Sequence, residues 1–160
     1  MTVVANGDVK AGNAGIVAAI IPGGSLYDVN VTANGAIDAR FGVDAENFGF
    51  GKTTVKTVGA VAATTGNGVY ALTNGGNVSV TTDAVTSTGN TAIVARQAKA
   101  NAVGTIDVTA NGNVSGTTGI EATNIGLDSA VSITAKGTVT GTSAEGIKTT
   151  GNGPVTVAVS

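Results

Sequence analysis

The chain has 160 residues, of which 25 are glycine, 42% are hydrophobic and only 11% are charged, and its formal net charge is −2. Charges this sparse and balanced exclude a basic nucleic-acid-binding surface and a disordered polyelectrolyte. The absence of cysteine and histidine excludes disulfides, thiol or imidazole catalysis and almost every zinc, copper or haem site, so we expect no metal and no cofactor.

The sequence consists of repeats. The segment 29–45 (VNVTANGAIDARFGVDA) returns as 106–122 (IDVTANGNVSGTTGIEA), and further copies begin near residues 3, 53, 78 and 131. Equivalent apolar residues lie 24 to 28 residues apart, which gives a period of about 26. The first set of these residues is Val3, Val31, Val55, Val80, Val108, Ile133 and Val157. The second set is Ile16, Val43, Val69, Ile93, Ile120 and Ile147.

Each copy predicts three short strands. In the copy at 29–45, apolar residues alternate with others in three runs, 29–33, 37–39 and 43–45, and this period of two is typical of strands. Gly35 and Gly42 stand between the runs, where the chain must turn. One copy cannot bury its own apolar face, but copies stacked about 4.8 Å apart enclose a continuous core.

We therefore predict an all-β fold: a right-handed parallel β-helix, or β-solenoid, of about six coils with about 26 residues and three short strands each. Residues 1–160 are expected to form a single solenoid segment of a longer repeat protein. All charged residues fall between inward positions or in loops, as the cost of burying an unpartnered charge requires. The longest apolar stretch, 16–22, is too short to cross a membrane, so we expect no membrane insertion by this segment.

Two stretches carry a resemblance to a known class of proteins. Residues 108–122 (VTANGNVSGTTGIEA) and 131–147 (VSITAKGTVTGTSAEGI) resemble the glycine-rich coils of right-handed β-helical passengers of bacterial autotransporters and filamentous-haemagglutinin-like surface proteins. The resemblance concerns the coil, and no catalytic motif accompanies it. It implies secretion to the bacterial cell surface, anchoring through a membrane barrel outside this sequence, and a non-enzymatic role as an adhesin or a stalk.

A right-handed β-helix can also be a polysaccharide-degrading enzyme. Such an enzyme needs acidic residues stacked on adjacent coils for calcium binding or acid/base catalysis. In the predicted register Asp38 lies beside Lys10 and Glu121 beside Lys148, while Asp44 and Glu46 share one coil and face Tyr70 and Leu72. We therefore predict that the chain is not an enzyme and assign no catalytic residue.

Hydroxyl side chains dominate two outward columns that flank the first set of inward residues. Flat threonine ladders of this kind order water on β-solenoids that bind ice, although threonine is also simply favoured in strands. Ice binding or self-assembly through these columns is therefore the alternative function. The residues that we select from the columns are Thr81, Thr109, Ser132 and Thr134.

Aromatic residues are scarce, and most lie in or near the loops of the first two coils. A ligand patch of Tyr27, Arg40, Phe48 and Phe50 would bind a host-surface glycan or protein, whereas the alternative is that these side chains cover the edge of the core. The segments at 2–4 and 155–159 are also strand-like, and their unpaired edges predict end-to-end self-association. No nucleic-acid partner is expected.

Overall fold

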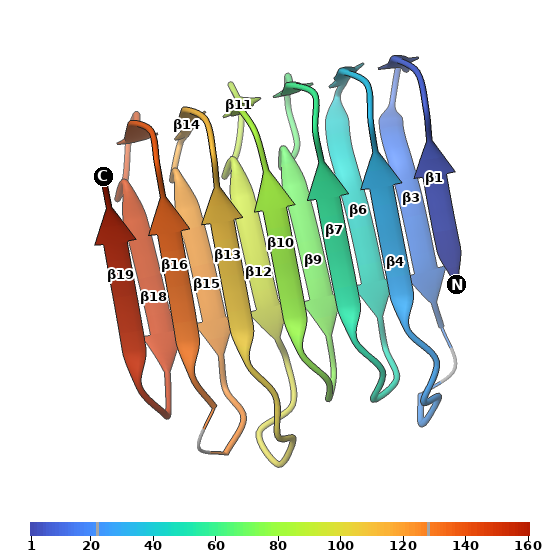
Figure 1. Ribbon diagram of the computed structural model, residues 1–160, viewed down its shortest axis with the longest axis vertical. Coiled ribbons are helices and arrows are strands. Elements are labelled where there is room, and N and C mark those ends of the chain that lie inside the picture. Colours follow the sequence, from blue (N-terminus) through green and yellow to red (C-terminus); the bar gives the residue numbers. More distant parts are fainter. Residues whose placement is uncertain (22, 128) are drawn as a thin grey trace.

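The computed structural model describes residues 1–21, 23–127 and 129–160, and within these it contains strands and no helix. In Figure 1 the chain rises along the front sheet, crosses the top, descends along the back and advances towards the C-terminus, which is the path of a right-handed coil. All strand pairs between neighbouring coils are parallel. The predicted parallel β-solenoid of about six coils is therefore confirmed.

The strands form three parallel sheets, which we name A, B and C in the order in which each coil visits them. Sheet A contains β1 (Thr2–Ala5), β4 (Val29–Ala33), β7 (Thr53–Thr57), β10 (Val78–Thr82), β13 (Ile106–Ala110), β16 (Val131–Ala135) and β19 (Val155–Val159). Sheet B contains β2 (Val9–Lys10), β5 (Ile37–Ala39), β8 (Val61–Ala63), β11 (Val85–Ser87), β14 (Val114–Gly116) and β17 (Val139–Gly141). Sheet C contains β3 (Ala14–Ile20), β6 (Phe41–Asn47), β9 (Val69–Thr73), β12 (Ile93–Gln97), β15 (Ile120–Asn124) and β18 (Ile147–Gly151).

The predicted register is correct in both anchor columns. Val3, Val31 and Val55 pair in sequence along sheet A, and the column continues to Val157 without a slip. Ile16 pairs with Val43 on sheet C, and that column continues to Ile147. Because side chains alternate between the faces of a strand, this register places the apolar residues inside and their neighbours outside.

The core is a continuous stack of small apolar side chains between sheets A and C, with sheet B closing one narrow side (Figure 1). Its largest fully buried side chains are isoleucines, among them Ile93, Ile106 and Ile120. No charged residue of the described part is buried, as predicted, and Asp128 lies outside that part. None of the described segments is a helix long and apolar enough to cross a membrane.

The last residues of several sheet C strands form a column of buried polar side chains, which we did not predict. The Asn124 side chain donates a hydrogen bond from Nδ2 to the Gly104 carbonyl (2.9 Å) and accepts one at Oδ1 from Gly126 N (3.1 Å). Asn47 Nδ2 likewise donates to the Tyr27 carbonyl at 2.9 Å. These bonds attach the loops between sheets C and A to the stack. The members of the column are Asn47, Thr73, Gln97 and Asn124.

The last strand of sheet A is open on one edge. Val155, Val157 and Val159 on β19 are 44%, 46% and 59% exposed, although their equivalents on β16 are buried. A strand that pairs with β19, from a further coil or from a second copy, would cover these side chains. End-to-end self-association remains a prediction that the arrangement of a single chain does not test.

Candidate functional site

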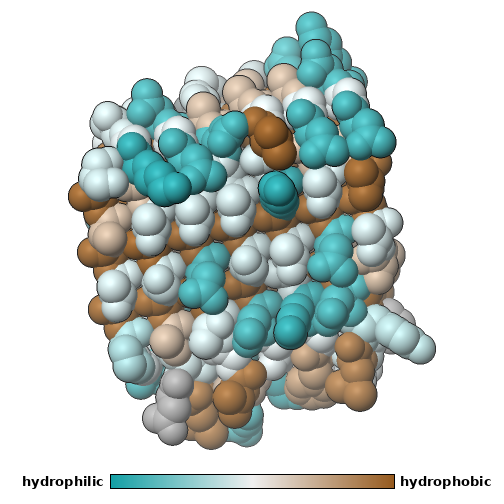
Figure 2. All heavy atoms as spheres, viewed as in Figure 1, coloured by the Kyte–Doolittle hydropathy of each residue, from teal (hydrophilic) through white to brown (hydrophobic). Residues whose placement is uncertain are grey.

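Exposed apolar side chains gather along the loops that connect sheet C to sheet A, and we call this side of the solenoid the loop edge. Leu26 and Tyr27 are 79% and 78% exposed, and brown spheres lie along the lower border of Figure 2. Soluble proteins rarely expose apolar residues in groups without using them for binding. The exposed apolar residues of the loop edge are Ile21, Leu26, Tyr27, Phe48, Phe50, Val103 and Leu127.

The aromatic residues of the loop edge are held by contacts with loops of other coils. Phe50 N donates to the Ser25 carbonyl at 2.6 Å, and Lys99 Nζ lies 4.4 Å from the centroid of the Phe50 ring, which is a cation–π contact. Asn47 binds the Tyr27 carbonyl, so the loops that carry Tyr27, Phe48 and Phe50 lie against each other. These three predicted patch residues therefore share one surface.

Arg40, the fourth predicted patch residue, lies elsewhere. It occupies the corner between β5 and β6 and donates from Nε to Thr65 Oγ1 at 3.4 Å. The seven residues of β6 separate it from Phe48, a span of about 23 Å for an extended strand. The sequence analysis grouped them because both lie next to loops of the first two coils, but the strand predicted at 43–45 crosses a whole sheet between them.

The hydroxyl columns lie on the outer face of sheet A, where the predicted order is confirmed. Thr81 pairs with Thr109, which pairs with Thr134, while Ser132 lies two residues before Thr134 on the same face. Figure 2 shows these columns as pale rows across the strands, interrupted by teal spheres. Lys56 and Asp107 are the charged members of the columns in the register.

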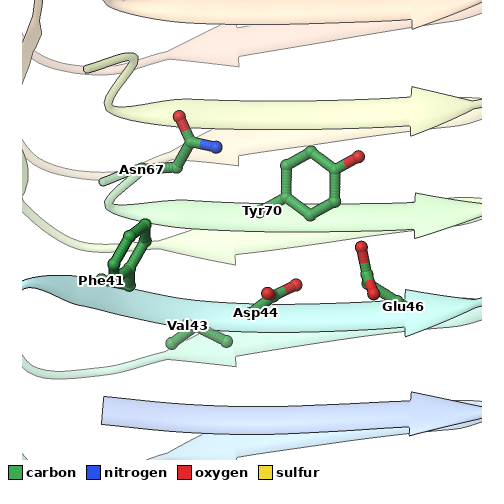
Figure 3. A pocket seen from close by; sticks show the side chains of 6 residues that line it. All are labelled: Phe41, Val43, Asp44, Glu46, Asn67 and Tyr70. Carbon is green, nitrogen blue, oxygen red and sulfur yellow. The ribbon is translucent and has the colours of Figure 1, made fainter. Parts of the chain in front are cut away.

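A cavity on the outer face of sheet C was missed by the sequence analysis. It has a volume of about 220 Å³ and lies over β6 and β9, with two carboxylates and two aromatic rings around it (Figure 3). Asp44 and Glu46 alternate along β6, so both point outward, and Tyr70 of β9 pairs with Asp44. The lining residues are Phe41, Val43, Asp44, Glu46, Asn67 and Tyr70.

Burial changes the acid–base properties of this cavity. Desolvation raises the pKa of Asp44 above the ordinary aspartate value, and desolvation together with the Asp44 charge raises the pKa of Glu46. Desolvation also raises the pKa of Tyr70, and the charge of Glu46 adds to this rise while the charge of Arg96 opposes it. Asp44 Oδ1 is buried without a hydrogen-bond partner. The chain thus keeps two carboxylates half-buried side by side, an arrangement that disfavours their charged forms.

Replacing Asp44 with asparagine is expected to raise the melting temperature at pH 7. Because the folded-state pKa of Asp44 is raised, the folded chain binds more protons than the unfolded chain as pH rises above 3.8, and the free energy of unfolding falls with pH. Asp44→Asn removes this loss, so its advantage should appear at neutral pH and vanish below pH 3.8. Melting curves at several pH values measure it, with Glu121→Gln on the same sheet as the charge control. A lower melting temperature for Asp44→Asn at pH 7 would contradict the desolvation argument.

Comparisons with protein-family models, with curated proteins and with solved structures found no match to this chain. Residues 1–21, 23–127 and 129–160 contain no group of three or more acidic, histidine or cysteine side chains arranged to hold a metal ion. The surfaces that remain as candidates are the loop edge, the hydroxyl columns and the cavity over β6 and β9.

Proposed function

We propose that this chain is a rigid, non-enzymatic adhesive segment of a protein displayed on a bacterial surface. The observation that carries the proposal is the loop edge, where apolar side chains gather and the most exposed of them, Leu26 and Tyr27, project side by side from a stack with a continuous apolar core. The bacterial surface location, in the manner of an autotransporter passenger or a haemagglutinin-like protein, rests on the resemblance of its glycine-rich coils. Its partner would be a glycan or a protein of a host surface.

The proposed mechanism is mechanical and multivalent. Hydrogen bonds between parallel strands join every coil to the next and hold the loops at fixed spacing. Single contacts through exposed side chains are weak, but several loops or several chains that engage one surface multiply the effective affinity. Adhesion of this kind needs no catalytic residue and tolerates variation in the loops.

The experiment is a bead-adhesion assay with the purified chain on cultured epithelial cells and on a glycan array. We expect coated beads to adhere, and the double variant Leu26→Ser with Tyr27→Ser to lose most of that adhesion at an unchanged melting temperature. Val58→Ser is the matched control, because Val58 is 47% exposed at a corner away from the loop edge. Beads that fail to adhere to any surface, or adhesion that the double variant leaves intact, would refute the proposal.

Ice binding is the second candidate, supported by the aligned hydroxyl columns of sheet A. The run Thr81, Thr109 and Thr134 repeats at the spacing of neighbouring strands, about 4.8 Å, on one regular face. If the columns bind ice, the chain should show thermal hysteresis, and Thr109→Tyr should abolish it. Thr86→Tyr on the outer face of sheet B is the control and should leave the hysteresis unchanged. A chain without thermal hysteresis would rule out this candidate.

A further inference from the structure

The cavity over β6 and β9 contains negative charge but no cation of its own. None of its six lining residues is lysine or arginine. Along sheet C, Asp44 pairs with Val17 on one side and Tyr70 on the other, while Glu46 pairs with Ala19 and Leu72. Neither carboxylate therefore has an opposite charge at the paired position on an adjacent coil.

One carboxylate oxygen of the cavity lacks a hydrogen-bond donor. Asp44 Oδ1 is inaccessible to water and accepts no hydrogen bond from the chain. A buried polar atom without a partner is costly, and the cost is greater for a charged group. Because this oxygen is closed to water, a ligand in the cavity cannot reach it without movement of the chain, so a cationic ligand would act by offsetting the negative charges of Asp44 and Glu46 together.

Aromatic rings form the other walls of the cavity. Figure 3 shows the Tyr70 ring on β9 above the two carboxylates and the Phe41 ring at one end. Phe41 packs over Gly66 of the next coil, where a side chain would overlap its ring. Aromatic faces attract cations, and the chain already uses such a contact at its loop edge, between Lys99 and Phe50.

From these features we infer that the cavity binds an organic cation: a primary ammonium or guanidinium group carried on an apolar stem. The cationic group would lie between Asp44, Glu46 and the Tyr70 ring, and the stem would contact Phe41. A guanidinium group offers five N–H donors in a fixed fork, which suits two carboxylates placed two residues apart on one strand. The site lies on the opposite sheet from the hydroxyl columns and shares no lining residue with the loop edge, so it stands independently of the proposed adhesive function.

Other ligand classes fit the cavity less well. A calcium ion takes six to eight oxygen ligands, whereas two of the six lining residues of this cavity, Phe41 and Tyr70, present aromatic rings. A neutral sugar would supply hydroxyl donors but would leave the two half-buried negative charges uncompensated. A cation with an apolar stem is the ligand class that fits both the two negative charges and the aromatic rings of the cavity.

Two sources can supply such a cation, and they are separated by the choice of probe. A free diamine is represented by 1,4-diaminobutane, and a basic side chain of another protein by the peptide acetyl-Gly-Arg-Gly-amide. The neutral analogue acetyl-Gly-citrulline-Gly-amide keeps the shape of the peptide without its charge. Each probe is titrated into the ¹⁵N-labelled full chain, and backbone amide shifts are followed by NMR, with calcium chloride as the inorganic probe.

We expect saturable shifts confined to residues 41–46 and 67–70 with the arginine peptide, the diamine or both, and none with the citrulline peptide. The probe that binds more tightly identifies the source. Glu46→Gln should weaken binding about tenfold, because it removes a charge-assisted hydrogen bond. Glu121→Gln removes a negative charge from the column of Asp44 outside the cavity and should leave binding within about twofold. Tyr70→Leu should weaken binding and Tyr70→Phe should retain it, because the ring supplies the contact.

Several results would overturn this inference. Equal binding of the citrulline peptide would identify a neutral polar ligand instead, and saturable calcium shifts that compete with the peptide would identify a metal site. If Glu121→Gln weakened binding as much as Glu46→Gln, the binding would depend on general surface charge and not on this cavity. Absence of shifts with every probe would refute the site. Asp44→Asn, which we expect to raise the melting temperature, should still weaken binding, and that combination would show that the loss of binding does not come from unfolding.

Discussion

Replacing Val108 with aspartate is expected to unfold the chain or melt its central coils at room temperature. Val108 is 1% exposed in the middle of β13, between Val80 and Ile133 of the adjacent coils. A carboxylate at this position would be buried without a partner, at a cost of at least about 3–5 kcal/mol. That loss approaches the total stability of many domains, which is about 5–15 kcal/mol.

The matched control is the neighbouring residue. Thr109→Asp places the same side chain on the outer face of sheet A, between Thr81 and Thr134, where water solvates it. We expect this variant to change the free energy of unfolding by less than about 1 kcal/mol. Circular dichroism during thermal and urea denaturation measures both variants. Equal losses of stability would mean that the register is displaced by one residue.

Replacing Gly76 with alanine is expected to cost about 1–3 kcal/mol. A Cβ at Gly76 would overlap the carbonyl oxygen of Gly51 on the preceding coil and lie 2.6 Å from its carbon and 2.9 Å from Lys52 N. All three atoms belong to the backbone, which cannot move aside as a side chain can. The two coils would have to separate locally, and the strands that leave this corner, β7 and β10, would pair less well.

Gly12→Ala provides the comparison for Gly76→Ala. A Cβ at Gly12 would meet no atom within 4 Å, and the residue lies between β2 and β3. Alanine there restricts the unfolded chain and should leave stability unchanged or slightly higher. Urea denaturation of both variants gives the difference. A Gly76→Ala variant as stable as Gly12→Ala would show that the stack adapts its coil spacing more easily than the backbone contacts indicate.

The sequence was sufficient to predict the coil and its register because one physical rule governs both. Strands that pair in register must present apolar residues to the same side, so the columns through Val31 and Val43 could be aligned from hydrophobicity alone. The charge distribution provided an independent check, since a register shifted by one residue would have buried Asp38 or Asp107. The fold therefore follows from alternation and period, without homologues.

The buried polar column could not be predicted by the same rule. Asn47, Gln97 and Asn124 point inward at the ends of strands, where the alternation rule expects apolar residues. Their amide NH2 groups donate hydrogen bonds to loop carbonyls, so their burial depends on loop conformations that no periodicity specifies. The signal that could have identified them is their common position, four residues after the second anchor column.

The cavity was missed for a different reason. The sequence places Asp44 and Glu46 on one coil beside Tyr70 and Leu72, but this neighbourhood alone does not indicate a hollow between them. Their burial depends on the neighbouring Tyr70 and Phe41 rings, and ring positions follow from packing rather than from sequence spacing. Arg40 illustrates the converse error: it is close to Phe48 in sequence and lies at the other end of a strand.

The uniform separation of paired residues has a consequence for the kinetics of folding. Partners in sheet A lie 24 to 28 residues apart at every step from Val3 to Val157, so each new coil closes a loop of nearly the same length. The entropic cost of closure therefore hardly varies along the chain, and no coil is favoured as the starting point by topology. Once two coils have docked, each further coil adds to a template that already exists. Folding should then spread outward as a growing front, and hydrogen exchange should be slowest in the middle of the stack.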